Sequence, residues 1–165
     1  MLERYYHAEL PWRRMHRMAI TCASWRPAPS ASPRPVVPLE LSDVPALTEL
    51  YKRHPESAFS ADLFPRALYV GVYDGNRIVA AGGTHVLDSA HGIAVLGNIL
   101  TAPEVRARGY ATAVTAALVT VLLDLQFSLV VLNVFEDNGT AGRLYQRLGF
   151  QTHHHLMTGR AALAQ

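Results

Sequence analysis

The feature that most constrains the fold is an apolar run of eight residues, SLVVLNVF, at positions 128–135. A strand that is apolar on both faces is typical of a sheet covered on both faces, as parallel sheets are. An expected helix over residues 109–125 comes directly before it, and an expected strand over residues 93–100 comes before that helix. Strand, helix and strand in this order predict a parallel pair with a right-handed crossover.

The elements before this unit indicate antiparallel neighbours. Residues 68–73 alternate apolar side chains, the turn signal Asp74-Gly75-Asn76 follows, and residues 77–86 form the expected returning strand. The remaining expected elements are a helix over residues 42–54, a short helix over 60–64, a helix over 138–148 and a strand over 150–157. The sequence therefore predicts an α/β (α+β) fold: a mixed, mostly antiparallel central sheet with one parallel strand–helix–strand unit and helices on both faces.

The first part of the chain is expected to stand apart from this domain. Residues 27–38, PAPSASPRPVVP, hold half of the ten prolines, and such a stretch is typical of an extended, semi-rigid linker. We therefore divide the chain into an N-terminal extension with its linker, residues 1–35, and a main domain, residues 36–165. Within the extension we expect a short helix over Tyr5–Met15 and a strand over Met18–Trp25.

The composition of the chain argues against two classes of binding partner, nucleic acids and membranes. A net charge of +2 is too weak to predict a nucleic-acid partner. Cys22 is the single cysteine, which excludes an internal disulfide and fits a cytoplasmic location, although a cysteine-poor secreted protein also fits. The longest chargeless apolar run expected to be helical, Tyr110–Leu123, has 14 residues, whereas a membrane-spanning helix needs about 20. We therefore expect neither a nucleic-acid nor a membrane partner.

The segment VRARGYAT, residues 105–112, lies where the long helix is expected to begin. The first amides of a helix lack partners within it and the helix dipole makes that end positive, which suits a phosphate. Gly109 and Ala111 keep the side chains small, and Arg106 and Arg108 add positive charge. The alternative is that Gly109 only eases a tight turn and both arginines are solvated. A Walker loop and a dinucleotide fingerprint are excluded, because their lysine and spaced glycines are missing.

Two motifs together resemble the GNAT superfamily of N-acetyltransferases. The loop resembles the superfamily's Q/R-x-x-G-x-G/A pattern at Arg106, Gly109 and Ala111. The later helix resembles its N-x-x-A-x-x-L-Y-x-x-x-G-F signature, here Asn138-x-x-Ala141-x-x-Leu144-Tyr145-x-x-Leu148-Gly149-Phe150. The resemblance covers about Val36 to Met157 and implies the GNAT fold. The stretches GTHV and AVLGNILTAPEVRARGYA are most similar to a bacterial branch related to glycine N-acyltransferase-like enzymes.

The resemblance implies acetyl-CoA, or another acyl-CoA, as co-substrate. Its pyrophosphate would lie on the main-chain amides of the loop. Its pantetheine arm would lie along the edge of strand 93–100, where this strand separates from strand 128–135, and would bond there like an added strand. The cofactor-binding residues implied in this way are Leu100, Thr101, Arg106, Ala107, Arg108, Gly109, Tyr110, Ala111, Thr112, Asn138 and Tyr145.

The implied reaction is the attack of an amine on the thioester. Tyr145 matches the family tyrosine that protonates the leaving thiolate as a general acid. Asn138 matches the family asparagine that bonds the pantetheine or orients the site, and its place before the helix also fits an ordinary N-cap.

The general base is left open. Many relatives carry a carboxylate on the strand before the loop, whereas IAVLGNIL has only Asn98, which can hold a water molecule or the substrate amine. His85 is a candidate base, because an imidazole titrates near neutral pH. Glu136 and Asp137 are further candidates. Loss of the proton to bulk water through ordered waters is the alternative.

The three histidines at 153–155 raise the question of a metal site. On a strand, His153 and His155 share one face and offer two ligands. No carboxylate or cysteine stands at a useful spacing, so we expect a solvated strand end and no metal.

These features predict an enzyme that transfers an acetyl group from acetyl-CoA to a primary amine, with a small amine or an amino acid as acceptor. An acetyltransferase for a protein N-terminus or a lysine is one alternative. A non-catalytic, regulatory acyl-CoA-binding module is another, suggested by the missing strand carboxylate. A homodimer that pairs through the last strand is left open.

Overall fold

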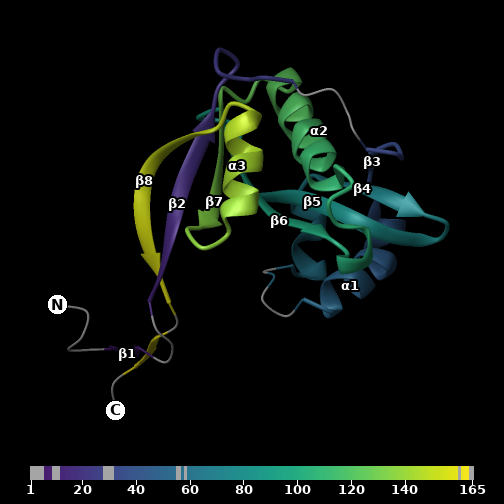
Figure 1. Cartoon of the computed structure of the whole chain (residues 1–165), viewed down its shortest axis with the longest axis horizontal. Helices are drawn as coiled ribbons and strands as arrows, with labels where there is room; N and C mark the ends of the chain where they lie inside the picture. The colour runs from purple at the N-terminus through teal and green to yellow at the C-terminus, as the bar shows by residue number, and fades with distance from the viewer. Residues whose placement is uncertain are drawn as a thin grey trace.

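A seven-stranded sheet runs through the computed structural model, in the order β3-β4-β5-β6-β7-β2-β8 (Figure 1). Its strands are β3 (Val37–Pro38), β4 (Tyr69–Asp74), β5 (Arg77–Asp88), β6 (Ile93–Thr101), β7 (Leu129–Phe135), β2 (Arg13–Ile20) and β8 (Gln151–Thr158). Two further strands, β1 (Tyr6–Ala8) and β9 (Ala161–Leu163), form a separate antiparallel pair. The structure describes residues 6–8, 12–27, 32–54, 57, 59–159 and 161–163.

The sheet is mixed, as the sequence predicts. Only β6 and β7 are parallel, and every other pair of neighbours in the described sheet is antiparallel. Helix α2 (Tyr110–Asp124) connects the parallel pair and lies with α3 (Gly139–Arg147) on one face, whereas α1 (Val44–Lys52) lies on the other (Figure 1). Three short 3₁₀ helices complete the described helices: η2 (Leu41–Asp43), η3 (Ala61–Arg66) and η4 (Pro103–Val105).

The core lies mainly between the sheet and α2. Val114, Leu118 and Leu122 of α2 are fully buried, which agrees with the chargeless sequence of this helix. One face of β7 is buried at Val130, Leu132 and Val134, but the other face is only half-buried and exposes Asn133. The expectation that this strand is covered on both faces is therefore wrong for one face, because α1 packs on the sheet at β5 rather than at β7.

Strand β2 departs from the expected organisation. The expected boundary near residue 36 puts it in an extension, whereas it lies inside the sheet, between β7 and β8. Met18 and Ile20 are each 1% exposed on its buried face. The helix expected over residues 5–15 is wrong for Tyr6–Ala8 and for residues 13–15, which are strands, and residues 9–11 lie outside the described part. The strand expected over 18–25 is correct only for residues 18–20.

The segment that follows β2 packs on the end of α3. The backbone N–H of Arg26 donates to the carbonyl of Leu148 at 3.0 Å. Gly149 has φ +100°, and a Cβ atom there would overlap the carbonyl oxygen of Ser24. Glycine is therefore required at this position by both the backbone conformation and the space.

The described part of the chain contains no helix whose length and hydropathy suffice to cross a membrane.

Substitution tests whether β2 is an integral strand. We expect Met18→Ala to lower the free energy of unfolding by about 2–5 kcal/mol, because it opens a cavity in the core. The control is Leu125→Ala at the end of α2, where the side chain is 58% exposed and the expected change is within about 0.5 kcal/mol. Equal effects in urea unfolding would contradict the placement of β2 in the sheet.

Candidate functional site

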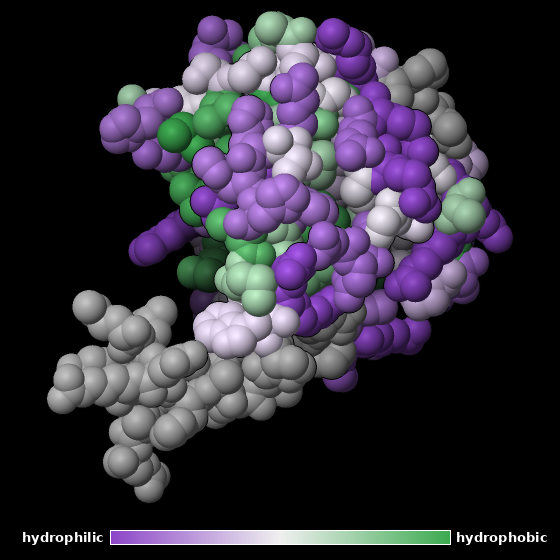
Figure 2. Space-filling view, turned by 60° about the vertical axis from the view of Figure 1, so that its left-hand side comes forward, coloured by the Kyte–Doolittle hydropathy of each residue, from purple (hydrophilic) through white to green (hydrophobic). Residues whose placement is uncertain are grey.

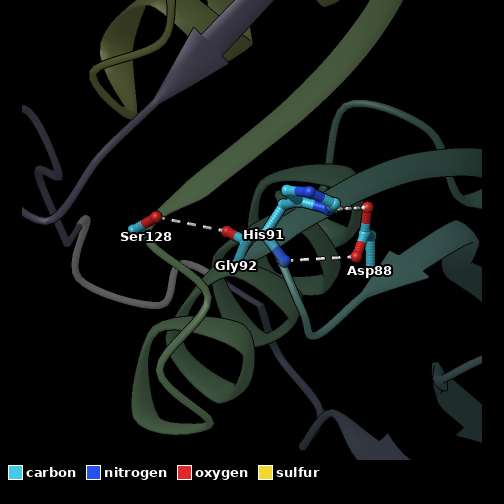
Figure 3. A network of polar contacts seen from close by, with 4 residues as sticks. All are labelled: Asp88, His91, Gly92 and Ser128. Atoms are coloured by element: carbon cyan, nitrogen blue, oxygen red, sulfur yellow. Dashed lines mark hydrogen bonds and ion pairs between the residues drawn. The ribbon is translucent and has the colours of Figure 1, made fainter.

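Strands β6 and β7 are joined at their beginnings and separate toward their ends. They pair from Ile93 with Leu129 to Leu96 with Leu132. Where they begin, the hydroxyl of Ser128 donates to the carbonyl of Gly92 at 3.3 Å (Figure 3). The N–H of Leu129 donates to the same carbonyl at 3.1 Å. Beyond Leu96, the edge of β6 that faces β7 carries no strand pairing in the described structure.

The turn before β6 is fixed by His91, which is exposed. Its backbone N–H and its Nδ1 contact the two carboxylate oxygens of Asp88, at 3.2 and 2.8 Å (Figure 3). Hydrogen bonds from His91 hold the pKa of the Asp88 carboxyl below its ordinary value. This turn lies at the joined end of β6 and β7, away from the opening.

A bulge at Asn98 begins the separation of the strands. Asn98 has φ +55°, and the register between β5 and β6 shifts here, from Ala81 with Leu100 to Gly83 with Gly97. The hydroxyl of Tyr51 in α1 donates to the backbone carbonyl of Asn98. The side-chain amide of Asn98 donates to the hydroxyl of Tyr69 at 2.9 Å. The bulge is therefore held from the α1 side by two tyrosines.

Neither tyrosine was among the predicted site residues. Burial raises the pKa of Tyr51 well above its usual value, and burial also raises that of Tyr69, against a lowering by the hydrogen bond from Asn98. In the sequence Tyr51 matches the apolar face of its helix, so the pattern indicates only a core residue. Its contact with a strand 47 positions away is a tertiary one.

His85 lies beside this bulge, on the face of the sheet that also carries the ring of Tyr69. A Cβ atom on Gly97 would overlap the imidazole of His85, and one on Gly83 would overlap the ring of Tyr69. Gly83 and Gly97 are partners across β5 and β6, and partners in an antiparallel pair point to the same face. The structure therefore brings His85, Tyr69 and Asn98 together, with the His85 side chain exposed.

The loop at the other end of the opening has the backbone of an anion site. Ala107 has φ +61°, and Gly109, the N-cap of α2, has φ +81°. No side chain caps the first turn of α2, so its amides keep their donors free in the described structure. Arg106 and Arg108 are exposed, and Nε of Arg106 donates to the carbonyl of Thr101 at 3.3 Å.

Thr101 at the end of β6 carries a polar atom without a partner. Its hydroxyl oxygen is buried and makes no hydrogen bond within the described part of the chain. Leu100 and Thr101 belong to the stretch of β6 that β7 leaves unpaired. A buried hydroxyl of this kind calls for a partner, because an unmade hydrogen bond costs about 1–3 kcal/mol.

Helix α3 supplies Asn138 and Tyr145. The side-chain oxygen of Asn138 accepts from the N–H of Ala141 at 3.2 Å, so Asn138 is the N-cap of the helix. Tyr145 is 8% exposed, and its ring meets that of Phe150 edge-on at 5.8 Å. Burial raises the pKa of the Tyr145 phenol to about 12.

The other residues considered as a general base or as metal ligands lie outside the group around the bulge. Asp137 forms an exposed ion pair with Arg13 at 2.9 Å, and Glu136 is exposed in the turn after β7. Nδ1 of His155 lies 3.1 Å from Nδ1 of His16 on β2, a contact that the sequence did not predict. Among the described residues, no group of three or more metal-binding side chains gathers at one place.

A cavity of about 140 Å³ lies elsewhere, between α1 and residues 102–104. Its walls carry Glu49 of α1, Arg53 directly after this helix, and the ion pair of Arg77 with Glu104, at 3.0 Å. None of the residues around the bulge lines it. The charged cavity is therefore separate from the bulge.

Comparison with known proteins connects these features with a family. Residues 36–150 match the model of the acetyltransferase (GNAT) family. No match was found among curated protein sequences. Among solved structures, the chain is similar to a GNAT-family protein from Novosphingobium aromaticivorans, with 21% identity and a TM-score of 0.80, covering 97% of this chain and 68% of the other.

Two further structures share the fold. A GCN5-related N-acetyltransferase from Kribbella flavida has 15% identity and a TM-score of 0.69, covering 94% of this chain and 61% of its own. The ribosomal-protein-S18-alanine N-acetyltransferase from Escherichia coli has 25% identity and a TM-score of 0.63, covering 73% of this chain and 79% of its own. The chain thus spans about two thirds of the length of the first two relatives.

The burial of Tyr145 can be measured through its titration. We expect the difference in near-ultraviolet phenolate absorbance between the wild type and Tyr145→Phe to titrate at about pH 12. The folded pKa exceeds the ordinary value of 10.0, so ionisation favours unfolding as the pH rises between these values. Absorbance is therefore read immediately after a pH jump, before unfolding. A midpoint near 10 would contradict the burial of this side chain.

Proposed function

Because the chain belongs to the GNAT acetyltransferase family, we propose that it transfers an acetyl group from acetyl-CoA to a primary amine. The observation that carries this proposal is the opening between β6 and β7. The uncapped start of α2 lies at one end of it, and the bulge at Asn98 lies at the other. Asn138 and Tyr145 come from α3, the helix that follows β7.

The residues along the opening fit an acyl-CoA. The amides of residues 106–112 would hold the pyrophosphate, with Arg106 and Arg108 adding charge. The unpaired edge of β6 at Leu100 and Thr101 would bond the amide-rich arm as a strand edge bonds a peptide. The unpartnered hydroxyl of Thr101 supports this placement. The side-chain oxygen of Asn138 accepts the hydrogen bond that caps the helix, so its side-chain NH₂ group could donate to the cofactor.

The bound thioester supplies an activated acetyl group. In the transfer, the amine nitrogen forms a bond to the acetyl carbon, the carbon–sulfur bond breaks, and the amine loses a proton. Tyr145 would protonate the departing thiolate, because a tyrosine phenol carries its proton at neutral pH, and burial, which raises its pKa to about 12, leaves it in that form. Its loss would therefore slow the chemical step rather than weaken cofactor binding.

On the amine side, Asn98 and His85 are the residues that we propose. The amide of Asn98 would position the amine or a water molecule. His85 would take up the proton of the amine, because its exposed imidazole lies over Gly97 next to the bulge. Asp137 is a weaker candidate, since its carboxylate is paired with Arg13.

For the acceptor we propose a small amine or an amino acid, as the resemblance to glycine N-acyltransferase-like enzymes implies. An acceptor at a protein N-terminus is the second candidate, favoured by the 25% identity with an alanine N-acetyltransferase of a ribosomal protein. A regulatory acyl-CoA-binding module without turnover is the third, favoured by the lack of a carboxylate on β6.

The cellular location and the partners of the protein are proposed from its cysteine, its net charge and its edge strand. We propose a cytoplasmic location, because the single cysteine, Cys22, is a free and exposed thiol. We propose no nucleic-acid or membrane partner, in keeping with a net charge of +2. A homodimer would form at β8, the edge strand of the sheet, whose outer backbone groups are unpaired in the described structure.

Removal of one hydroxyl tests the proposed role of Tyr145. We expect Tyr145→Phe to lower kcat for acetyl-CoA-dependent thiol release by about 10²–10⁴-fold, the usual contribution of a general acid, with little change in acetyl-CoA affinity. The control is Tyr73→Phe, because the hydroxyl of Tyr73 bonds Asp43 instead of facing the opening. An unchanged kcat in Tyr145→Phe would remove the general acid and favour the binding module.

A further inference from the structure

Four aromatic rings form a continuous cluster on the α1 face. Tyr51 stacks on Phe59, with ring centres 4.7 Å apart and planes at 17°. Phe59 meets Tyr69 edge-on at 5.9 Å, and Tyr69 stacks on Phe64 at 5.2 Å. Tyr51, Phe64 and Tyr69 are buried, whereas Phe59 is only partly buried. Phe59 is therefore the ring of the cluster that remains accessible to a ligand.

The cluster is attached to the bulge. Its two tyrosines make the hydrogen bonds that hold Asn98, so the cluster is joined to the proposed reaction centre by these two contacts. The imidazole of His85 lies on the same face, over Gly97, next to the Tyr69 ring over Gly83. An acceptor that lies against Phe59 would therefore contact an aromatic ring of this cluster.

The cluster contains no negative charge within the described structure. In the described part of the chain, the hydroxyls of Tyr51 and Tyr69 bond Asn98, in contrast to that of Tyr73, which bonds the carboxylate of Asp43. An acceptor with several ammonium groups would have to give up its hydration here without a carboxylate partner, which is unfavourable. A flat, uncharged group would instead gain the additional contact energy of an aromatic pair.

From these contacts we infer that the acceptor is a primary amine carried on an aromatic group, whose ring lies against Phe59 and whose nitrogen points to Asn98 and His85. This inference rests on the proposed acetyl transfer and narrows it to one class of acceptor. Phe59 is then a specificity residue: it binds the ring of the acceptor and takes no part in proton transfer.

A matched pair of amines tests the inference in thiol-release assays with acetyl-CoA. We expect kcat/KM for 2-phenylethylamine to exceed that for 2-cyclohexylethylamine by about 2- to 10-fold, the value of an aromatic pair beyond its buried area. Spermidine and glycine should be poorer than both. In Phe59→Leu the preference for the aromatic amine should disappear, while Leu125→Ala, exposed at the far end of α2, should keep it.

The outcomes separate the inference from the proposed function. Equal rates for the matched pair, a preference for spermidine or glycine, or an unchanged preference in Phe59→Leu would overturn the aromatic acceptor and leave acetyl transfer intact. Acetyl-CoA binding without turnover of any amine would overturn the inference and favour the binding module. No binding of acetyl-CoA by the wild type would overturn both. A thermal shift with acetyl-CoA shows that Phe59→Leu is folded.

Discussion

The end of the parallel pairing between β6 and β7, at Leu96 and Leu132, is the constraint on which the rest of the structure depends. Two parallel strands normally continue side by side and satisfy each other's backbone groups. Here the bulge at Asn98, held by Tyr51 and Tyr69, turns the end of β6 away. As a result, backbone N–H and C=O groups at this edge of β6 have no partner strand, and an amide-rich ligand could form hydrogen bonds with them.

The sheet stays intact around this gap because β7 has a second neighbour. From Phe135 back to Val130 it pairs with β2, which comes from the first twenty residues. The opening therefore lies between two parts of the sheet: β3 to β6 with α1, and β7, β2 and β8 with α3 (Figure 1). The face in view in Figure 2 carries many hydrophilic residues, with hydrophobic ones at the surface among them.

The local sequence pattern was sufficient to predict those elements whose structure depends mainly on their own residues. The apolar run at 128–135 and the helix before it predicted the parallel unit, and Asn138 was correctly expected as an N-cap. Only the end of strand β2, residues 18–20, was expected as a strand; the first part escaped prediction because its arginines and His16 give residues 13–17 no apolar pattern. The hydrogen bonds around Asn98 escaped prediction for another reason: they join α1, β4 and β6, and no spacing within the sequence encodes them.

The most direct test of this account is the thermal stability of the protein with acetyl-CoA, compared with ATP and NAD. A ligand that binds only the folded state raises the unfolding midpoint, by the equivalent of about 2.7 kcal/mol at a hundredfold excess over Kd. We expect a clear rise with acetyl-CoA, because of these three ligands only acetyl-CoA has both a pyrophosphate for the start of α2 and an amide-rich arm for the edge of β6. An equal rise with all three would show a phosphate site alone, and no rise with acetyl-CoA would contradict the central claim.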